Sequence, residues 1–132
     1  MSSGYFEKVD GYLADIDVEI VSRDEGEGLF VVDNESRGIH NLIIDCEEEL
    51  LVLEQVIFVL KSQDPAILRQ LLTMNRELVH GAFALDEENR VLFRDTLQLS
   101  NLDPNELEAS INALALALAT YADDLIGFAA AA

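Results

Sequence analysis

The segment Leu50–Leu60 constrains the fold more than any other part of the sequence, because it is apolar almost without interruption. Its β-branched and aromatic content favours a strand over a helix. Alternate residues of a strand point to opposite faces, so both faces of this strand should be apolar. One face would carry Leu51, Leu53, Ile57 and Val59, and the other Leu50, Val52, Val56, Phe58 and Leu60. Such a strand needs helices on one side and a different covering on the other.

The residues before this segment alternate between short apolar runs and turn signals. Residues 5–16 repeat apolar side chains at helical spacing and predict a short helix. A strand containing Val18 and Ile20 should then lead into an acidic, glycine-containing turn at 23–28. The next elements are expected in the order strand 29–32, turn 33–38, strand 39–45 and acidic turn 46–49.

The two prolines mark two helix starts. Asp64-Pro65 and Asp103-Pro104 each place an Asp N-cap before a proline at the first helical position, and Glu106 can complete a capping box with Asp103. After Asp103, one long helix is predicted by an apolar stripe made of Leu107, Ile111, Leu114, Leu118, Tyr121 and Leu125. Between the two helices we expect a hairpin with strands at 81–85 and 90–99 around a turn at 86–89.

The order of these elements predicts the fold class. Helix, four strands, helix, two strands and helix (α-β-β-β-β-α-β-β-α) describe an α+β protein with an antiparallel sheet and its helices on one face. At 132 residues, 1–132 should form a single domain, and residues 129–132 should be a frayed tail.

The charge balance restricts the partners. The chain has 26 Asp and Glu against 8 Lys and Arg, a formal net charge of -18. Such a field repels nucleic-acid phosphates and anionic lipid headgroups, so we expect no nucleic acid and no membrane as partner. Cys46 is the only cysteine, which excludes an internal disulfide and favours a reducing compartment. The N-terminal residues lack the pattern of a signal peptide, and a cytoplasmic location is expected.

The acids, the two histidines and Cys46 are the residues that could carry out chemistry or bind a metal. The acidic residues 45–49 match no calcium-loop pattern, and His40 and His80 share no zinc-ligand spacing with each other or with Cys46. No sequence context marks Cys46 as a nucleophile. We therefore expect no cofactor, no metal and no enzymatic activity, with a carboxylate-dependent enzyme as a remote alternative. Asp95 falls in phase with core residues of its strand; it could turn toward the core, but we expect a bulge or strand end to place it in water.

The sequence from Asp64 onward resembles a known family. The resemblance is carried by Asp64-Pro65, Met74-Asn75-Arg76-Glu77-Leu78, Gly81-Ala82-Phe83-Ala84-Leu85-Asp86, Arg90-Val91-Leu92-Phe93-Arg94 and Leu102-Asp103-Pro104-Asn105-Glu106-Leu107. It resembles the Tir-chaperone family of type III secretion chaperones and the related YbjN-like proteins. The resemblance implies a compact α+β protomer, a homodimer, no catalysis, and apolar patches that hold an extended segment of a client protein.

Two features of the residues agree with a protein-binding role. The strand at 50–60 is apolar on both faces, and Leu116 lies off the main apolar stripe of the last helix. The candidate contacts for a client or a second copy are Leu50, Val52, Val56, Phe58 and Leu116. The chain is thus expected to be a dimeric, chaperone-like module that holds a client segment. The alternative is a YbjN-like regulatory or stress-response adaptor that holds no client.

Overall fold

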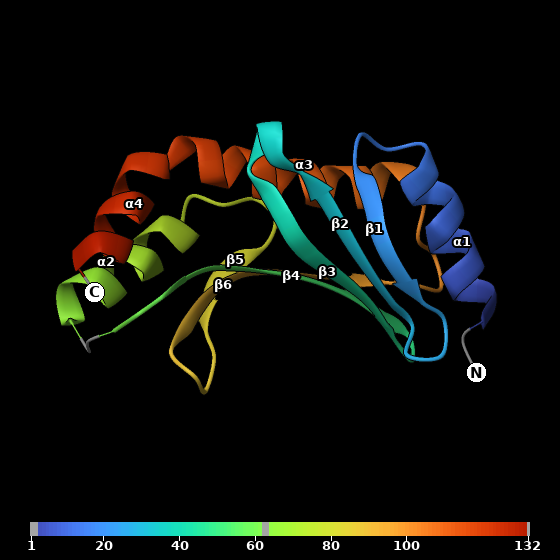
Figure 1. The fold of residues 1–132 in the computed structure, drawn as a ribbon, viewed down its shortest axis with the longest axis horizontal. Helices are drawn as coiled ribbons and strands as arrows, with labels where there is room; N and C mark the ends of the chain where they lie inside the picture. Colours follow the sequence, from blue (N-terminus) through green and yellow to red (C-terminus); the bar gives the residue numbers. More distant parts are fainter. Residues whose placement is uncertain (1–2, 62–63, 132) are drawn as a thin grey trace.

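A computed structural model describes residues 3–61 and 64–131 of the chain (Figure 1). The elements are α1 (Ser3–Ala14), β1 (Glu19–Asp24), β2 (Leu29–Asn34), a short 3-10 turn η1 (Glu35–Arg37), β3 (Ile39–Glu47), β4 (Leu50–Val59), α2 (Pro65–Asn75), β5 (Ala82–Leu85), β6 (Arg90–Gln98), α3 (Pro104–Thr120) and α4 (Ala122–Ala131). The predicted α+β class is confirmed, and the predicted order holds up to the last helix, which is divided in two.

All six strands form one antiparallel sheet in the order β1-β2-β3-β4-β6-β5. The first four strands follow one another as hairpins. α2 then leaves the sheet, and the chain returns as β5 at the edge before β6 pairs with β4. In Figure 1, α3 runs across one face of the sheet, α1 lies at the β1 end, and α2 and α4 are both at the other end.

The core lies between the sheet and these helices. α1 contributes Val9 and Leu13, both fully buried, and its Phe6 ring stacks on Phe30 of β2 with centroids 4.3 Å apart. α3 contributes an apolar face made of Leu107, Ile111, Leu114 and Ala117. Burial of apolar area at about 25 cal/mol per Å² makes this layer the main stabilising contribution to the fold.

Both predicted helix starts are present. The Asp64 carboxylate accepts a hydrogen bond from the Ala66 N–H at 2.9 Å. At the start of α3, the Asp103 carboxylate accepts from the Glu106 N–H at 2.8 Å, while the Glu106 carboxylate accepts from the Asp103 N–H at 3.1 Å. The reciprocal pair is the predicted capping box and satisfies two backbone donors that a helix start leaves open.

The prediction of one long final helix is wrong. α3 ends at Thr120 with Tyr121 as its C-cap, and the chain continues as α4 after a bend of 69°. The bend brings Phe128 of α4 to Phe58 of β4, with ring centroids 6.3 Å apart, while the Tyr121 ring meets Phe83 edge-on. α4 includes residues 129–131; Ala132 lies outside the described residues. No single helix in the described part is long and apolar enough to cross a bilayer; α3 and α4 together pass that test only as a bent pair.

The passage from α2 to β5 is held by Asn75 and Gly81. The Asn75 side-chain amide donates to the Phe83 C=O at 3.0 Å, and its oxygen accepts from the Phe83 N–H at 2.7 Å. Gly81 has φ +74°, and a Cβ there would lie 2.5 Å from two ring carbons of Phe93. These contacts give a physical reason for the Asn and Gly in the stretch that resembles the chaperone family.

Asp95 is the one acid in phase with the core residues of β6, and it turns toward the helices. Its carboxylate accepts a hydrogen bond from the Ser110 hydroxyl of α3 at 2.7 Å, and Ser110 is buried. The expectation that Asp95 lies in water is therefore wrong. A polar partner on α3 satisfies the carboxylate at the edge of the core.

Candidate protein-binding surfaces

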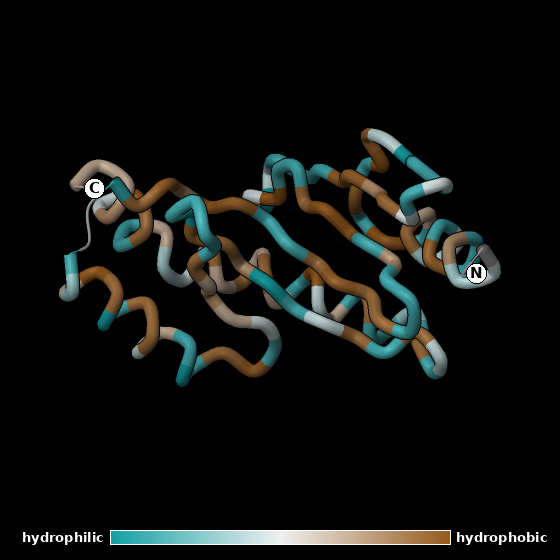
Figure 2. Tube along the Cα trace, turned by 90° about the horizontal axis from the view of Figure 1, so that it is seen from below, coloured by the Kyte–Doolittle hydropathy of each residue, from teal (hydrophilic) through white to brown (hydrophobic). Residues whose placement is uncertain are grey.

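The sheet face turned away from α1, α3 and α4 is uncovered, and we call it the open face. Figure 2 shows the molecule from this side. Among the described residues, no helix lies across it. Its exposed large apolar side chains are Ile43, Leu50, Val56 and Val59, which are 41–48% exposed. Val52 and Leu92 also belong to this face, because they alternate along their strands with residues of the helix-covered core.

Strand β4 has two apolar faces, as the sequence predicts, but the division between them differs at one end. A bulge at Ile57 shifts the register, so that Val56 pairs with Leu92 and Phe58 with Val91. An extra residue in a strand reverses the facing of every residue after it. Phe58 and Leu60 therefore lie in the helix-covered core, and Val59 lies on the open face. The assignment of Phe58 to the same face as Val56 is wrong.

The five predicted contact residues are thus divided among three environments. Leu50 and Val56 are exposed on the open face, and Val52 lies beside them at 8% exposure. Phe58 packs against Phe128 in the core. Leu116 is 68% exposed on the opposite side of the molecule, on α3.

One end of the open face is hollowed. The hollow has a volume of about 670 Å³ and is lined by His40, Asn41, Ile43, Glu54, Val56, Asp86, Arg90 and Leu92. Its basic group is already engaged, because Arg90 pairs with Asp86 at 2.7 Å and with Glu88 at 3.0 Å. Hydrogen bonds from the Arg90 backbone and side chain lower the pKa of Asp86. The apolar side chains Ile43, Val56 and Leu92 are therefore the part of the hollow that is available to contact a bound apolar group.

The other end of the open face is acidic. Asp45 and Glu47 alternate on β3 and lie across from Val52 and Leu50 of β4. Partial burial, a hydrogen bond with Glu47 and the charges of Glu47, Glu27 and Glu54 raise the pKa of Asp45 to about 6. Between the two ends, Arg94 of β6 pairs with Glu54 at 3.2 Å. In the described part of the chain, no ion pair joins Asp45 or Glu47 to a basic side chain.

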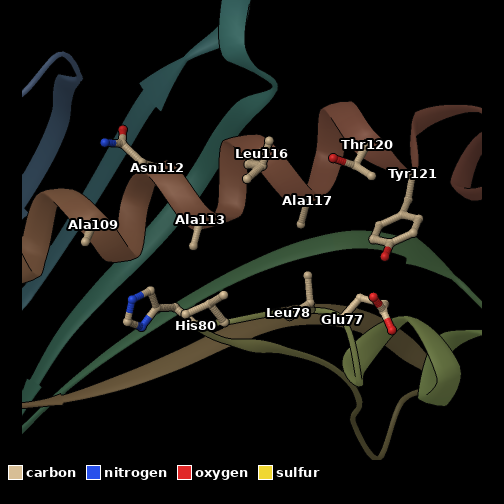
Figure 3. Close-up of a pocket in the computed structure, with 11 residues that line it drawn as sticks. Glu77, Leu78, His80, Ala109, Asn112, Ala113, Leu116, Ala117, Thr120 and Tyr121 are labelled. Carbon is tan, nitrogen blue, oxygen red and sulfur yellow. The ribbon is translucent and has the colours of Figure 1, made fainter.

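A second surface lies on the outside of α3. The helix carries no charged residue between Glu108 and Asp123, although 26% of the chain is charged. Leu116 stands between two grooves, one of about 400 Å³ facing residues 77–80 (Figure 3) and one of about 490 Å³ facing residues 36–38. In Figure 3, Ala113 and Ala117 point from α3 toward Leu78 and His80 across the first groove.

The family model CesT_Tir_1 matches residues 2–131. The protein is a member of the CesT_Tir_1 family. This confirms the resemblance to type III secretion chaperones. A search of curated proteins gave no match.

Solved structures share the fold of this CesT_Tir_1 protein at low identity. The structure of the HopA1-SchA chaperone-effector complex aligns with a TM-score of 0.63 and 16% identity, covering 97% of this chain and 95% of the other. An uncharacterized protein from Methanothermobacter thermautotrophicus aligns with a TM-score of 0.66 and 14% identity, covering 95% of this chain and 99% of the other. YbjN, a putative transcription regulator from E. coli, aligns with a TM-score of 0.66 and 10% identity, covering 89% of this chain and 91% of the other. At these identities the likeness concerns the fold.

The single cysteine of this CesT_Tir_1 protein is a packed side chain. Cys46 is 6% exposed in the core, and burial together with the neighbouring Asp45 charge raises the pKa of its thiol to about 11. The thiol is therefore protonated at neutral pH, whereas the nucleophile in cysteine chemistry is the thiolate.

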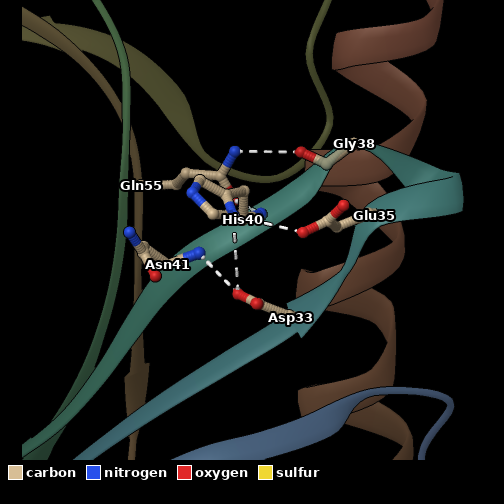
Figure 4. A network of polar contacts seen from close by, with 6 residues as sticks. All are labelled: Asp33, Glu35, Gly38, His40, Asn41 and Gln55. Atoms are coloured by element: carbon tan, nitrogen blue, oxygen red, sulfur yellow. Dashed lines mark hydrogen bonds and ion pairs between the residues drawn. The ribbon is translucent and has the colours of Figure 1, made fainter.

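The turn between β2 and β3 gathers a histidine and two acids that are not adjacent in sequence (Figure 4). His40 Nδ1 lies 3.9 Å from an Asp33 carboxylate oxygen and 3.8 Å from a Glu35 carboxylate oxygen, with one ligand atom of each within 4.8 Å of the others. Buried Gln55 accepts from the His40 N–H at 3.0 Å and donates to the Gly38 C=O at 3.0 Å. The group is exposed at His40 and Glu35, and its geometry is that of a solvated charge cluster beside the hollow.

The sequence missed several residues of the open face. Ile43 and Leu92 lie in strands that were predicted, yet nothing in their local pattern tells which face a helix covers. Val59 was predicted on the wrong face, because no glycine, proline or other turn residue in the sequence marks the bulge at Ile57. The Asp33–Glu35–His40 group was also not predicted, because its three residues match neither a zinc-ligand spacing nor a calcium-loop pattern and are brought together by the turn after β2.

Proposed function

We propose that this CesT_Tir_1 protein is a chaperone-like binding module that holds an apolar segment of a client polypeptide against its open face, without catalysis. The observation that carries the proposal is the uncovered face of the six-stranded sheet, with Ile43, Leu50, Val56 and Val59 exposed together. Adjoining exposed apolar side chains mark interaction surfaces, as Ile43 and Val56 do in the hollow, and Leu50 lies on the same face beyond the Glu54–Arg94 pair. The net charge of -18 keeps a protein with such a face in solution by repulsion between copies.

The affinity expected from this face alone is small. Covering a fully exposed Leu, Ile or Val contributes about 1.5–3 kcal/mol, so the four side chains, each just under half exposed, together contribute about 4 kcal/mol. Ordering the client segment and its side chains opposes binding by a comparable amount. A client must therefore use further contacts, either electrostatic or on a second protomer.

We also propose that the protein is a homodimer through the outside of α3. Two chains that each carry a charge of -18 can approach most easily where they present few carboxylates. The stretch from Ala109 to Ala122 carries none, and of the described residues Glu77 is the one acid that lines the groove beside it. In a two-fold arrangement, Leu116 of one copy would enter the groove beside Ala113 and Ala117 of the other. Small side chains at these positions allow two helices to pack closely.

The test of client holding uses an array of overlapping peptides from an unrelated denatured protein. The double variant Ile43→Ser/Val56→Ser should lose most binding to the array, because it removes two of the three apolar side chains that line the hollow. Leu72→Ser, which changes a residue 71% exposed on α2, is the matched control and should bind as the original protein does. Equal binding by all three proteins would refute the open face as the client site.

The regulatory alternative is favoured by one observation, the likeness in fold to YbjN, a putative transcription regulator. An adaptor of this kind would recognise a folded partner and not extended segments. In that case the original protein would bind no peptide on the array.

A further inference from the structure

The two ends of the open face could bind different kinds of side chain. The hollow end lacks an apolar occupant, since its arginine is paired with Asp86 and Glu88. The acidic end lacks a cation: Asp45 and Glu47 have no ion pair among the described residues, and the charged groups that face Asp45, namely Glu47, Glu27 and Glu54, are all acids. The nearby Arg94 is engaged with Glu54. A segment that satisfies both ends needs an apolar and a basic side chain.

The strand register gives the distance between the two ends. Val56 lines the hollow, and Val52 lies directly across from Asp45. Both are on β4, four residues apart and before the bulge at Ile57, and a strand rises about 3.4 Å per residue. The two ends are therefore separated by about 13 Å. An extended peptide covers this distance in about four residues, and residues separated by an even number point to the same side.

We propose that the open face selects an extended client segment in which a Lys or Arg stands about four residues from a large apolar side chain. The apolar side chain enters the hollow beside Ile43, Val56 and Leu92. The cation lies between the carboxylates of Asp45 and Glu47. This inference rests on the proposed function and adds the chemistry and the spacing that the client must have.

Protonation gives the site a pH dependence. The raised pKa of Asp45, about 6, means that the carboxyl is mostly ionised at pH 7 and mostly protonated at pH 5. A cation competes with the proton, so affinity should fall about tenfold between pH 7 and pH 5. A segment held only by apolar contacts would show no such change.

The experiment compares three synthetic peptides that differ only near a single Phe. The first has Lys about four positions from the Phe, the second has norleucine there, and the third has the Lys at two positions. The first should bind about tenfold more tightly than the other two at pH 7 and low salt, since one charge-assisted contact is worth about a factor of ten. Equal affinity of the Lys and norleucine peptides would overturn the proposal.

Variants separate the acidic pair from the general charge of the protein. Asp45→Asn/Glu47→Gln should bind the Lys peptide as weakly as the norleucine peptide, and at both pH values. Glu7→Gln/Glu108→Gln removes the same number of charges from exposed positions on α1 and α3 and should keep the preference. If both double variants lose the preference equally, the acidic pair has no specific role. Weak but equal binding of all peptides, abolished by Ile43→Ser/Val56→Ser, would leave the proposed function standing and refute only this inference.

Discussion

Asp45→Asn should make the protein more stable at neutral pH. The Asp45 carboxyl is partly buried on the open face and faces three other acids, so ionising it in the folded protein is unfavourable. An amide of the same shape keeps the packing beside Val52 and removes the charge. Asp45 therefore reduces the free energy of unfolding, which is what is expected of a group retained for binding and not for folding.

The magnitude follows from the pKa of Asp45. Folding raises it from 3.8 to about 6. At 1.36 kcal/mol per pKa unit the full effect would be about 3 kcal/mol, but solvent screens a partly exposed carboxyl and reduces it to about 1 kcal/mol. The native state binds the proton more tightly than the unfolded state, so Asp45 lowers stability as the pH rises from about 4 to about 6. Above pH 6 the destabilisation is complete and constant.

Urea denaturation at pH 7 and pH 4 measures this effect. The midpoint of Asp45→Asn should exceed that of the original protein at pH 7. The difference should be much smaller at pH 4, where Asp45 is protonated in the folded protein and close to half protonated in the unfolded chain. Glu48→Gln, an exposed acid in the adjacent turn, is the control for the loss of one negative charge. An equal gain from both variants, or a gain as large at pH 4 as at pH 7, would refute the reasoning.

Three further predictions concern the rest of the molecule. Asp103→Ala should lower the free energy of unfolding by about 1 kcal/mol, because it removes the capping box of α3; an unchanged urea midpoint would contradict that role. Gly81→Ala should lower it by about 2–4 kcal/mol, since the new Cβ meets the Phe93 ring at 2.5 Å and must adopt a positive φ; a loss below about 0.5 kcal/mol would show that the loop moves freely. Leu116→Asp should convert the proposed dimer to a 14.6 kDa monomer in light scattering, whereas Leu72→Asp should not; a monomeric original protein would refute the dimer.

The elements that the sequence predicted correctly are those with local signals. The two Asp-Pro pairs define the starts of α2 and α3, and the alternation of turn residues with apolar runs defines the hairpins. The family resemblance, carried by residues from Asp64 onward, was confirmed over nearly the whole chain.

The errors arose where tertiary contacts decide the local structure. The stripe from Leu107 to Leu125 is continuous in sequence, yet the helix bends at Tyr121 so that α4 can cover Phe58. No proline or glycine marks the bend. The bulge at Ile57 also has no signal in the sequence, and it places Phe58 in the core and not on the open face as predicted. Asp95 turned inward because Ser110, fifteen residues later, provides a hydroxyl. The open face itself could be located only after the helices were placed.

The central claim is that a client segment lies on the open face, and methyl NMR of the protein bound to the Phe–Lys peptide tests it most directly. The methyl signals of Ile43, Val52, Val56 and Leu92 should shift on binding, while those of Leu72 and Val79, exposed elsewhere, should stay unchanged. Leu116 should also remain unchanged if α3 serves the dimer. Shifts confined to Leu116 and the groove beside residues 77–80, with none on the open face, would contradict the account.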